Sequence, residues 1–214
     1  METEAPEPKW QRRKDARPPE ILDAAYRVFT EKGFAAARMD DIAKAAGVTK
    51  GTVYLYFDSK ETVFKALVVG AFSERFDRLT EVMAGYEGSC SGLLAEVLRA
   101  LGEFVATSER IGLPKIVIAE IGKFPELARF YRHEVIGRGL RLWDAILRRG
   151  IERGEFREVP VDHTIRLCIA PILLAAIWRT TFAQFDEQPY DIAGLIETHI
   201  DMLLRGLRKE SAAP

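Results

Sequence analysis

The sequence predicts an all-α fold, and three observations support this expectation. Apolar residues recur at helical spacing along almost the whole chain of 214 residues. No stretch of alternating β-branched residues bounded by turn signals is typical of a strand. Hydrophobic residues make up 48% and charged residues 29%, a balance that favours a buried core. We therefore expect about nine helices, arranged as a small three-helix domain followed by a larger helical domain.

The first helix is expected to begin at Pro18 and Pro19 and to end at Gly33. Proline suits the first turn of a helix, where its missing N–H costs nothing. Glycine suits the helix end, and Phe34 behind it can fold back on Phe29. One face of this helix is apolar and carries Ile21, Leu22, Ala25, Val28 and Phe29.

Two short helices joined by a turn that contains glycine are expected next. The first ends at Gly47 and carries an apolar stripe of Met39, Ile42, Ala43 and Ala46. The second begins after Thr49, a good N-cap, and turns Val53 and Phe57 inward. Helix, turn and helix in this order are the outline of a helix-turn-helix. Ser59 then caps a longer helix.

Apolar periodicity in the remainder of the chain predicts five more helices, after a connection rich in glycine and serine at residues 86–92. They are expected at residues 92–107, 113–122, 125–153, 161–185 and 191–208. The last has an apolar stripe along its whole length, formed by Ile192, Leu195, Ile196, His199, Ile200, Leu203, Leu204 and Leu207. Because the helix before it is apolar over most of its circumference, the two together carry more apolar surface than the fold of one chain is expected to cover.

Residues 33–67 read GFAAARMDDIAKAAGVTKGTVYLYFDSKETVFKAL and carry a specific motif. Its fixed residue types are Asp41-Ile42-Ala43, Ala46-Gly47-Val48, Lys50-Gly51-Thr52-Val53-Tyr54, Tyr56-Phe57 and Ser59-Lys60-Glu61. This segment resembles the tetracycline-repressor (TetR) family. The motif covers the N-terminal third, and the rest resembles the family in helix number and length. We expect a disordered basic tail at residues 1–17, a DNA-binding domain at 18–65, and an effector-binding and dimerisation domain at 66–209.

The resemblance implies that residues 49–57 form a recognition helix in the major groove. At 100° per residue, burial of Val53 and Phe57 places Gly51 and Leu55 on the opposite side. The expected DNA-binding residues are Arg38, Thr49, Lys50, Gly51, Thr52, Tyr54, Leu55, Tyr56 and Lys60. Gly51 permits close approach to the groove, Thr52 can bond a base edge or a phosphate, and Leu55 can pack on a thymine methyl.

Tyr54, Tyr56 and Lys60 are better suited to phosphates, whereas Lys50 suits either a base or a phosphate. The alternative for the two tyrosines is simple packing. The family commonly has a threonine cap at position 38 and often a histidine at position 55, so Arg38 and Leu55 are departures. With Arg38 the helix lacks the side-chain cap that threonine would provide, but it gains a cation that can bind a phosphate.

The distribution of charge supports the division of the chain into an N-terminal DNA-binding part and a larger second domain. Residues 9–65 hold twelve Lys and Arg against eight Asp and Glu, a net charge of +4, whereas the whole chain is at −1. The tail that includes Lys9, Arg12, Arg13, Lys14 and Arg17 can lie along a DNA backbone or enter a minor groove. A solvated arm without a DNA contact is the equal alternative.

The larger domain offers weaker candidates for a ligand site. Six residues could line a cavity between helices, although aromatic stripes more often belong to a core: Phe104, Trp143, Leu147, Leu173, Trp178 and Phe182. Arg129, Arg132 and Arg141 could receive an anionic effector or simply face water. We expect no metal site and no cofactor, because the three histidines lack partners at ligand spacing.

Several classes of function are excluded or disfavoured by the sequence. The apolar stretch at residues 167–178 is too short for a membrane span, and Pro171 interrupts it. The first residues do not resemble a secretory signal, so a cytoplasmic location is expected, with Cys90 and Cys168 as free thiols. No motif for a nucleophile, a phosphate loop or a catalytic metal suggests an enzyme.

The leading hypothesis is therefore a homodimeric, sequence-specific transcriptional regulator. The resemblance implies pairing through the last two long helices, binding to a palindromic double-stranded DNA operator, and release by a small-molecule effector. An activator of the same family is the alternative. A helical enzyme and an interaction module that has lost DNA binding are less favoured.

Overall fold

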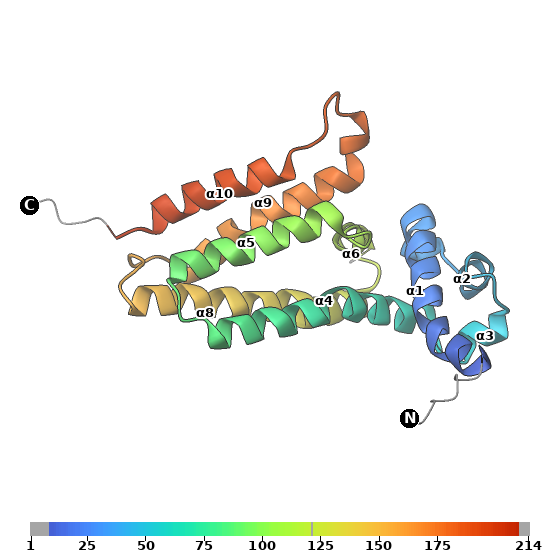
Figure 1. Ribbon diagram of the computed structural model, residues 1–214. Coiled ribbons are helices and arrows are strands. Elements are labelled where there is room, and N and C mark those ends of the chain that lie inside the picture. The colour runs from blue at the N-terminus through green and yellow to red at the C-terminus, as the bar shows by residue number, and fades with distance from the viewer. Residues whose placement is uncertain (1–8, 121, 210–214) are drawn as a thin grey trace, which may run out of the picture. The chain divides into compact units, whose positions relative to one another are not determined.

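The computed structural model describes residues 9–120 and 122–209, with side chains from Pro18 onward. The described residues are helical throughout, apart from loops and one isolated bridge between Phe156 and Arg208 (Figure 1). The chain divides into two compact units. The first contains the residues up to Gly70 together with Ile116–Ala128, and the second contains Ala71–Lys115 and the residues from Arg129 onward.

The α-helices follow the expected order closely. They are α1 (Lys9–Ala36), α2 (Met39–Ala45), α3 (Lys50–Tyr54), α4 (Lys60–Gly85), α5 (Cys90–Thr107), α6 (Leu113–Glu120), α7 (Pro125–Tyr131), α8 (Arg138–Glu152), α9 (Val161–Thr181) and α10 (Ile192–Leu207). A π-helical turn (Arg132–Gly137) links α7 to α8, and a 3-10 turn (Ala183–Phe185) follows α9. With α7, the π turn and α8 counted as one continuous helix, the described residues contain the expected nine helices.

The start of α1 differs from the expectation. The helix begins at Lys9, so Pro18 and Pro19 lie inside it, and residues 9–17 are helical where a disordered tail was expected. Lys, Gln, Arg and Ala, which dominate this stretch, have good helix propensity. Residues 1–8 lie outside the described part of the chain. Gly33 interrupts the helix with a φ of 76°, as expected for a glycine that ends a helix.

Aromatic packing forms the core of the first unit. The rings of Phe29 and Phe34 lie 5.2 Å apart, which confirms that the chain folds back after Gly33. Phe64 from α4 packs edge-on against Phe34 at 5.4 Å. All three phenylalanines are buried. This trio fixes α4 against the C-terminal part of α1.

A segment from far along the chain also packs in this unit. Ile116–Ala128 was expected within the larger domain, but it belongs to the same compact unit as α1 to α3. Its Phe124 ring lies 4.8 Å from the ring of Phe34, edge-on. A sequence pattern of short helices does not indicate this long-range contact, because periodicity reports only which face is apolar.

The second unit is built around α5, which contacts α8, α9 and α10. Figure 1 shows α10 running alongside α5 and α9. Gly102 permits this approach, because a Cβ at that position would lie 2.6 Å from Cγ1 of Ile196 on α10. Both cysteines are buried free thiols, as expected, and burial raises the pKa of Cys168 to about 12.

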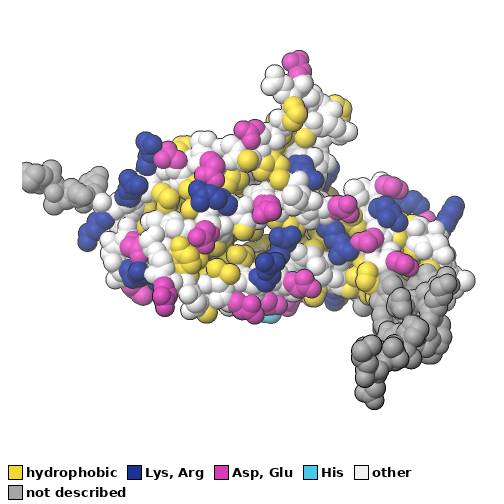
Figure 2. Space-filling model, in the orientation of Figure 1, with side chains coloured by type: hydrophobic (Ala, Val, Ile, Leu, Met, Phe, Trp, Pro, Cys, Tyr) yellow, Lys and Arg dark blue, Asp and Glu magenta, His cyan; other side chains and the backbone are white. Residues whose placement is uncertain are grey.

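Apolar surface on α9 and α10 remains exposed in the single chain. Leu167, Leu173 and Leu174 on α9 are exposed, as is Met202 on α10. By length and composition alone, α9 is apolar enough to cross a membrane. The buried core helices of other proteins meet the same criterion. Figure 2 shows hydrophobic side chains between interspersed Lys, Arg, Asp and Glu on the visible face.

Candidate nucleic-acid interface

The turn between α2 and α3 is fixed by local hydrogen bonds. Gly47 adopts a φ of +65°, a left-handed conformation that glycine takes without steric cost. The Val48 N–H donates to the carbonyl of Ala43 at 3.0 Å. Thr49 is the N-cap of α3, because its Oγ1 accepts the backbone N–H of Thr52 at 3.2 Å. The motif residues therefore set the angle at which α3 leaves α2.

The helix α3 ends at Tyr54, shorter than the recognition helix expected at residues 49–57, and burial separates two sides of α3 and of the residues up to Phe57 that follow it. Val53 is fully buried and Phe57 is 7% exposed, so both face the core as expected. Leu55, in contrast, is 82% exposed and Tyr54 is 42% exposed. Gly51 is exposed as well, and Thr52 is partly exposed. The side of α3 that turns away from the core is thus open and combines a glycine, a hydroxyl, an aromatic ring and an aliphatic side chain.

Lys50 at the start of α3 is paired with an acidic residue of α2. Its Nζ lies 2.8 Å from Oδ1 of Asp40, and both side chains are more than half exposed. The hydrogen bond to Asp40 raises the pKa of Lys50. Because an exposed ion pair of this kind is weak, a phosphate can compete for Lys50.

Arg38 precedes α2 at the position where the family commonly has a capping threonine. Its guanidinium cannot accept a hydrogen bond. Asp41 supplies the reciprocal contact instead, because its Oδ2 accepts the Arg38 backbone N–H at 3.0 Å. Lys32 donates to Asp41 at 2.6 Å and holds the pKa of that carboxyl below its usual range. The acidic residue three positions after the cap was the sequence signal for this arrangement.

Lys60 takes a role other than the expected phosphate contact. Its Nζ donates to the carbonyls of Phe34, Ala35 and Ala37 at 2.8, 3.0 and 3.2 Å. The ammonium also lies 4.7 Å from the centroid of the Phe34 ring. An ammonium has three protons, and all three are used here. Lys60 therefore satisfies the carbonyls at the end of α1, a contact that no sequence pattern of local period could reveal.

Replacing Lys60 tests this corrected role. We expect Lys60→Met to lower the free energy of unfolding by about 1–3 kcal/mol, because partly buried carbonyls lose their donor. Thermal or urea unfolding measures the change, and Lys44→Met, an exposed lysine of α2, is the matched control. DNA affinity well below the melting temperature should stay within about twofold, since no phosphate contact is lost. Preserved stability with a large loss of affinity would restore the phosphate role.

The six candidate ligand residues do not come together. Phe104, Trp143 and Leu147 are buried in the core of the second unit. Leu173 and Phe182 are exposed instead. Trp178 donates from Nε1 to Oδ2 of Asp186 at 2.7 Å and packs on Phe182 with ring centroids 5.1 Å apart. These residues were predicted together because they are large apolar side chains at helical spacing, but the fold places some of them in the core and others on the surface.

The described residues contain no group of three His, Cys, Asp or Glu side chains that could hold a metal ion. The donor set of the described helix-turn-helix is instead made of hydroxyl, ammonium and guanidinium groups, which suit phosphates and base edges. The class of protein that this fold and this exposed helix define is a DNA-binding transcriptional regulator.

Family models match an N-terminal and a C-terminal part of the chain. The model for bacterial regulatory proteins of the tetR family matches residues 21–67. A model for the tetracyclin repressor-like C-terminal domain matches residues 87–190. The chain therefore belongs to the TetR family of transcriptional regulators, whose members bind operator DNA as dimers.

Relatives of known sequence or structure agree. The regulator YfiR of Bacillus subtilis is 30% identical over 86% of this chain and 89% of its own length. The fatty acid metabolism regulator protein of the same species is 27% identical over 89% of this chain and 95% of its own. The crystal structure of Bacillus subtilis FadR in complex with stearoyl-CoA has a TM-score of 0.67 and 25% identity, covering 89% of this chain and 99% of that one.

Proposed function

We propose that this regulator is a repressor that occupies a palindromic operator and is released by a small-molecule effector. The observation that carries the proposal is the open side of α3 and of the residues directly after it, where Gly51 and Leu55 are exposed while Val53 and Phe57 are buried. A helix anchored on one side and bare on the other can enter a major groove without rearrangement.

We assign distinct roles to the exposed residues of this surface. Gly51 lets the backbone approach the groove wall, and Thr52 and Leu55 contact base edges and a thymine methyl. Thr49 and Lys50 at the helix start, with Tyr54 and Tyr56, bind phosphates and fix the register. Arg38 adds a further phosphate contact from the start of α2.

Dimerisation is proposed through α9 and α10. Leu167, Leu174 and Met202 are 63%, 55% and 69% exposed in the single chain. Exposed large apolar side chains that lie on neighbouring helices are typical of an interaction surface. Two such helices from each subunit can form a four-helix interface. The relatives are named as transcriptional regulators, and we extend this to the present chain as a regulator that is not an enzyme. We place it in the cytoplasm, since its partner is DNA.

The relatives suggest the chemistry of the effector. One of them regulates fatty acid metabolism, and a related structure holds stearoyl-CoA. We propose that a long-chain acyl thioester or its free acid releases this regulator from DNA. A ligand that binds the DNA-free form more tightly shifts the equilibrium by its difference in affinity.

A gel shift tests DNA binding and its relief together. Wild-type protein should retard a fragment upstream of its own gene at low salt, and Tyr54→Ala should bind about tenfold more weakly through loss of a phosphate contact. Palmitoyl-CoA should release the wild-type complex. Unchanged DNA mobility at low salt would refute the proposal. Transcription in vitro from the same fragment separates a repressor from an activator, since the sign depends on where the operator lies.

A further inference from the structure

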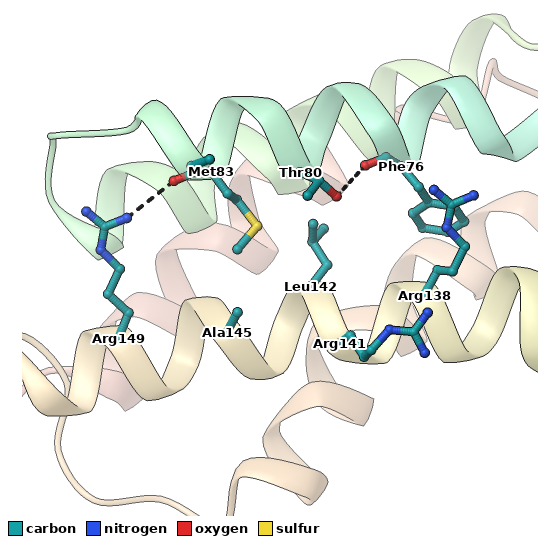
Figure 3. Close-up of a pocket in the computed structure, with 9 residues that line it drawn as sticks. Phe76, Thr80, Met83, Arg138, Arg141, Leu142, Ala145 and Arg149 are labelled. Atoms are coloured by element: carbon teal, nitrogen blue, oxygen red, sulfur yellow. Dashed lines mark hydrogen bonds between the residues drawn. The ribbon is translucent and has the colours of Figure 1, made fainter.

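A groove of about 480 Å³ opens between α4 and α8 in the second unit (Figure 3). It exists because small residues, Thr80 on α4 and Ala145 on α8, line the middle of the helix pair, where larger side chains would fill the space. Phe76, Met83 and Leu142 supply apolar walls. The groove is thus long, open and largely apolar in its middle.

One end of the groove carries two guanidinium groups. Figure 3 shows Arg138 and Arg141 together at that end, with Arg149 at the other. Arg149 donates to the carbonyls of Met83 at 3.4 Å and Tyr86 at 2.7 Å, and therefore serves the C-terminal end of α4. The cationic end that faces solvent is formed by Arg138 and Arg141.

The two arginines at this end differ in a way that suits a binding site. Arg138 is held in place, because it donates to Oδ1 of Asp77 at 2.5 Å and to Oγ of Ser73 at 3.3 Å. Its guanidinium also lies 5.2 Å from the centroid of the Phe76 ring. Arg141 is exposed and makes no hydrogen bond or ion pair with any residue that the structure describes. One fixed and one available guanidinium can together bind an anion in bidentate fashion.

No carboxylate lines the groove. Asp77, outside the lining, pairs with Arg138, so Arg141 is the guanidinium at this end that has no acidic partner among the described residues. We propose that this groove binds an amphipathic anion, with its phosphate or carboxylate head group at Arg138 and Arg141 and its aliphatic chain along Phe76, Met83 and Leu142. The inference rests on the proposed function, because it assigns the effector a place and a charge. A phosphorylated acyl thioester and a free fatty acid share this chemistry.

The site also lies on the helix that links the two units. α4 begins at Lys60 directly after the helix-turn-helix, and the groove is formed by its residues from Phe76 onward. A ligand seated between α4 and α8 contacts α4 itself, so its binding energy can be coupled to the conformation of that helix.

Calorimetric titration of the full chain tests the inference with palmitoyl-CoA, palmitate and coenzyme A alone. Arg141→Ala should weaken the binding of the favoured probe about tenfold and reduce its salt dependence, since one charged contact is lost. Arg148→Ala is the matched control: Arg148 is exposed on the same helix, does not line this groove and is paired with Asp144. The control should stay within about twofold of wild type. Ala145→Phe should fill the groove and abolish binding while the melting temperature is kept, since Ala145 is exposed.

The outcomes separate the two proposals. Sensitivity to Arg141→Ala with palmitate identifies a carboxylate head group, and sensitivity with palmitoyl-CoA alone identifies a phosphate. If palmitoyl-CoA releases wild-type protein from DNA but Arg141→Ala and Ala145→Phe respond as wild type does, the groove is not the site, and the proposed function stands. If no probe binds a wild-type protein that still binds DNA, both the groove and the effector class are wrong.

Discussion

Gly51→Glu should weaken operator binding by about 100-fold or more, because it places a carboxylate on the side of α3 that we propose to meet the phosphates and base edges. The substitution should not disturb folding. A Cβ at position 51 would have Oγ1 of Thr49 as its nearest neighbour, at 3.9 Å, which is ordinary van der Waals contact. Glutamate also has a better helix propensity than glycine and lies near the positive end of α3.

The measurement is a gel shift or fluorescence anisotropy titration at fixed salt, with the melting temperature determined in parallel. Gly85→Glu is the control, because Gly85 is exposed at the end of α4 and a Cβ there meets nothing within 4 Å. It should leave DNA affinity within about twofold, since its added charge is remote from the duplex. Equal affinity of Gly51→Glu and wild type would remove α3 from the interface.

The sequence predicted the helix-turn-helix well because its determinants are local. Thr49, Gly47 and the pair Val53 and Phe57 act within one or two turns, so spacing alone gives the cap, the turn and the buried side. The same applies to the return of Phe34 onto Phe29 after Gly33. The bounds of α5 and α10 are likewise close to those expected from apolar periodicity, and α7, the π turn and α8 together span the helix expected at residues 125–153.

The errors arose where the deciding contact lies far along the chain or where local preferences conflict. The motif predicts Lys60 as a phosphate ligand, but the carbonyls that it binds lie 23 to 26 residues earlier. Phe124 joins the first unit through a ring contact with Phe34, which no periodicity encodes. Pro18 and Pro19 predicted a helix start, yet the flanking residues continue α1 across them.

The candidate ligand residues show a further limit. Aromatic and aliphatic side chains at helical spacing predict an apolar face, but they do not say whether that face meets another helix, a ligand or a second subunit. Trp143 and Leu147 meet other helices, whereas Leu173 is left exposed. The groove between α4 and α8 depends on two small side chains, Thr80 and Ala145. A sequence pattern that is read from large apolar residues does not indicate such a groove.

Leu174→Asp should convert the protein to a monomer and thereby lower operator affinity by about 100-fold or more. Leu174 is 55% exposed on α9, within the surface that we propose for dimerisation. In a two-fold symmetric interface each substitution occurs twice, so two carboxylates would be buried without partners, at a cost of several kcal/mol. A monomer contacts one half-site only and loses the second set of DNA contacts.

Sedimentation or light scattering gives the oligomeric state, and a gel shift gives the affinity. Ile118→Asp is a closely matched control, because Ile118 on α6 is also 55% exposed but lies outside α9 and α10. It should remain dimeric and bind DNA, since Ile118 lies outside the surface that we propose for dimerisation. A dimeric Leu174→Asp would place the interface elsewhere, and the apolar exposure of α9 would then require a different partner.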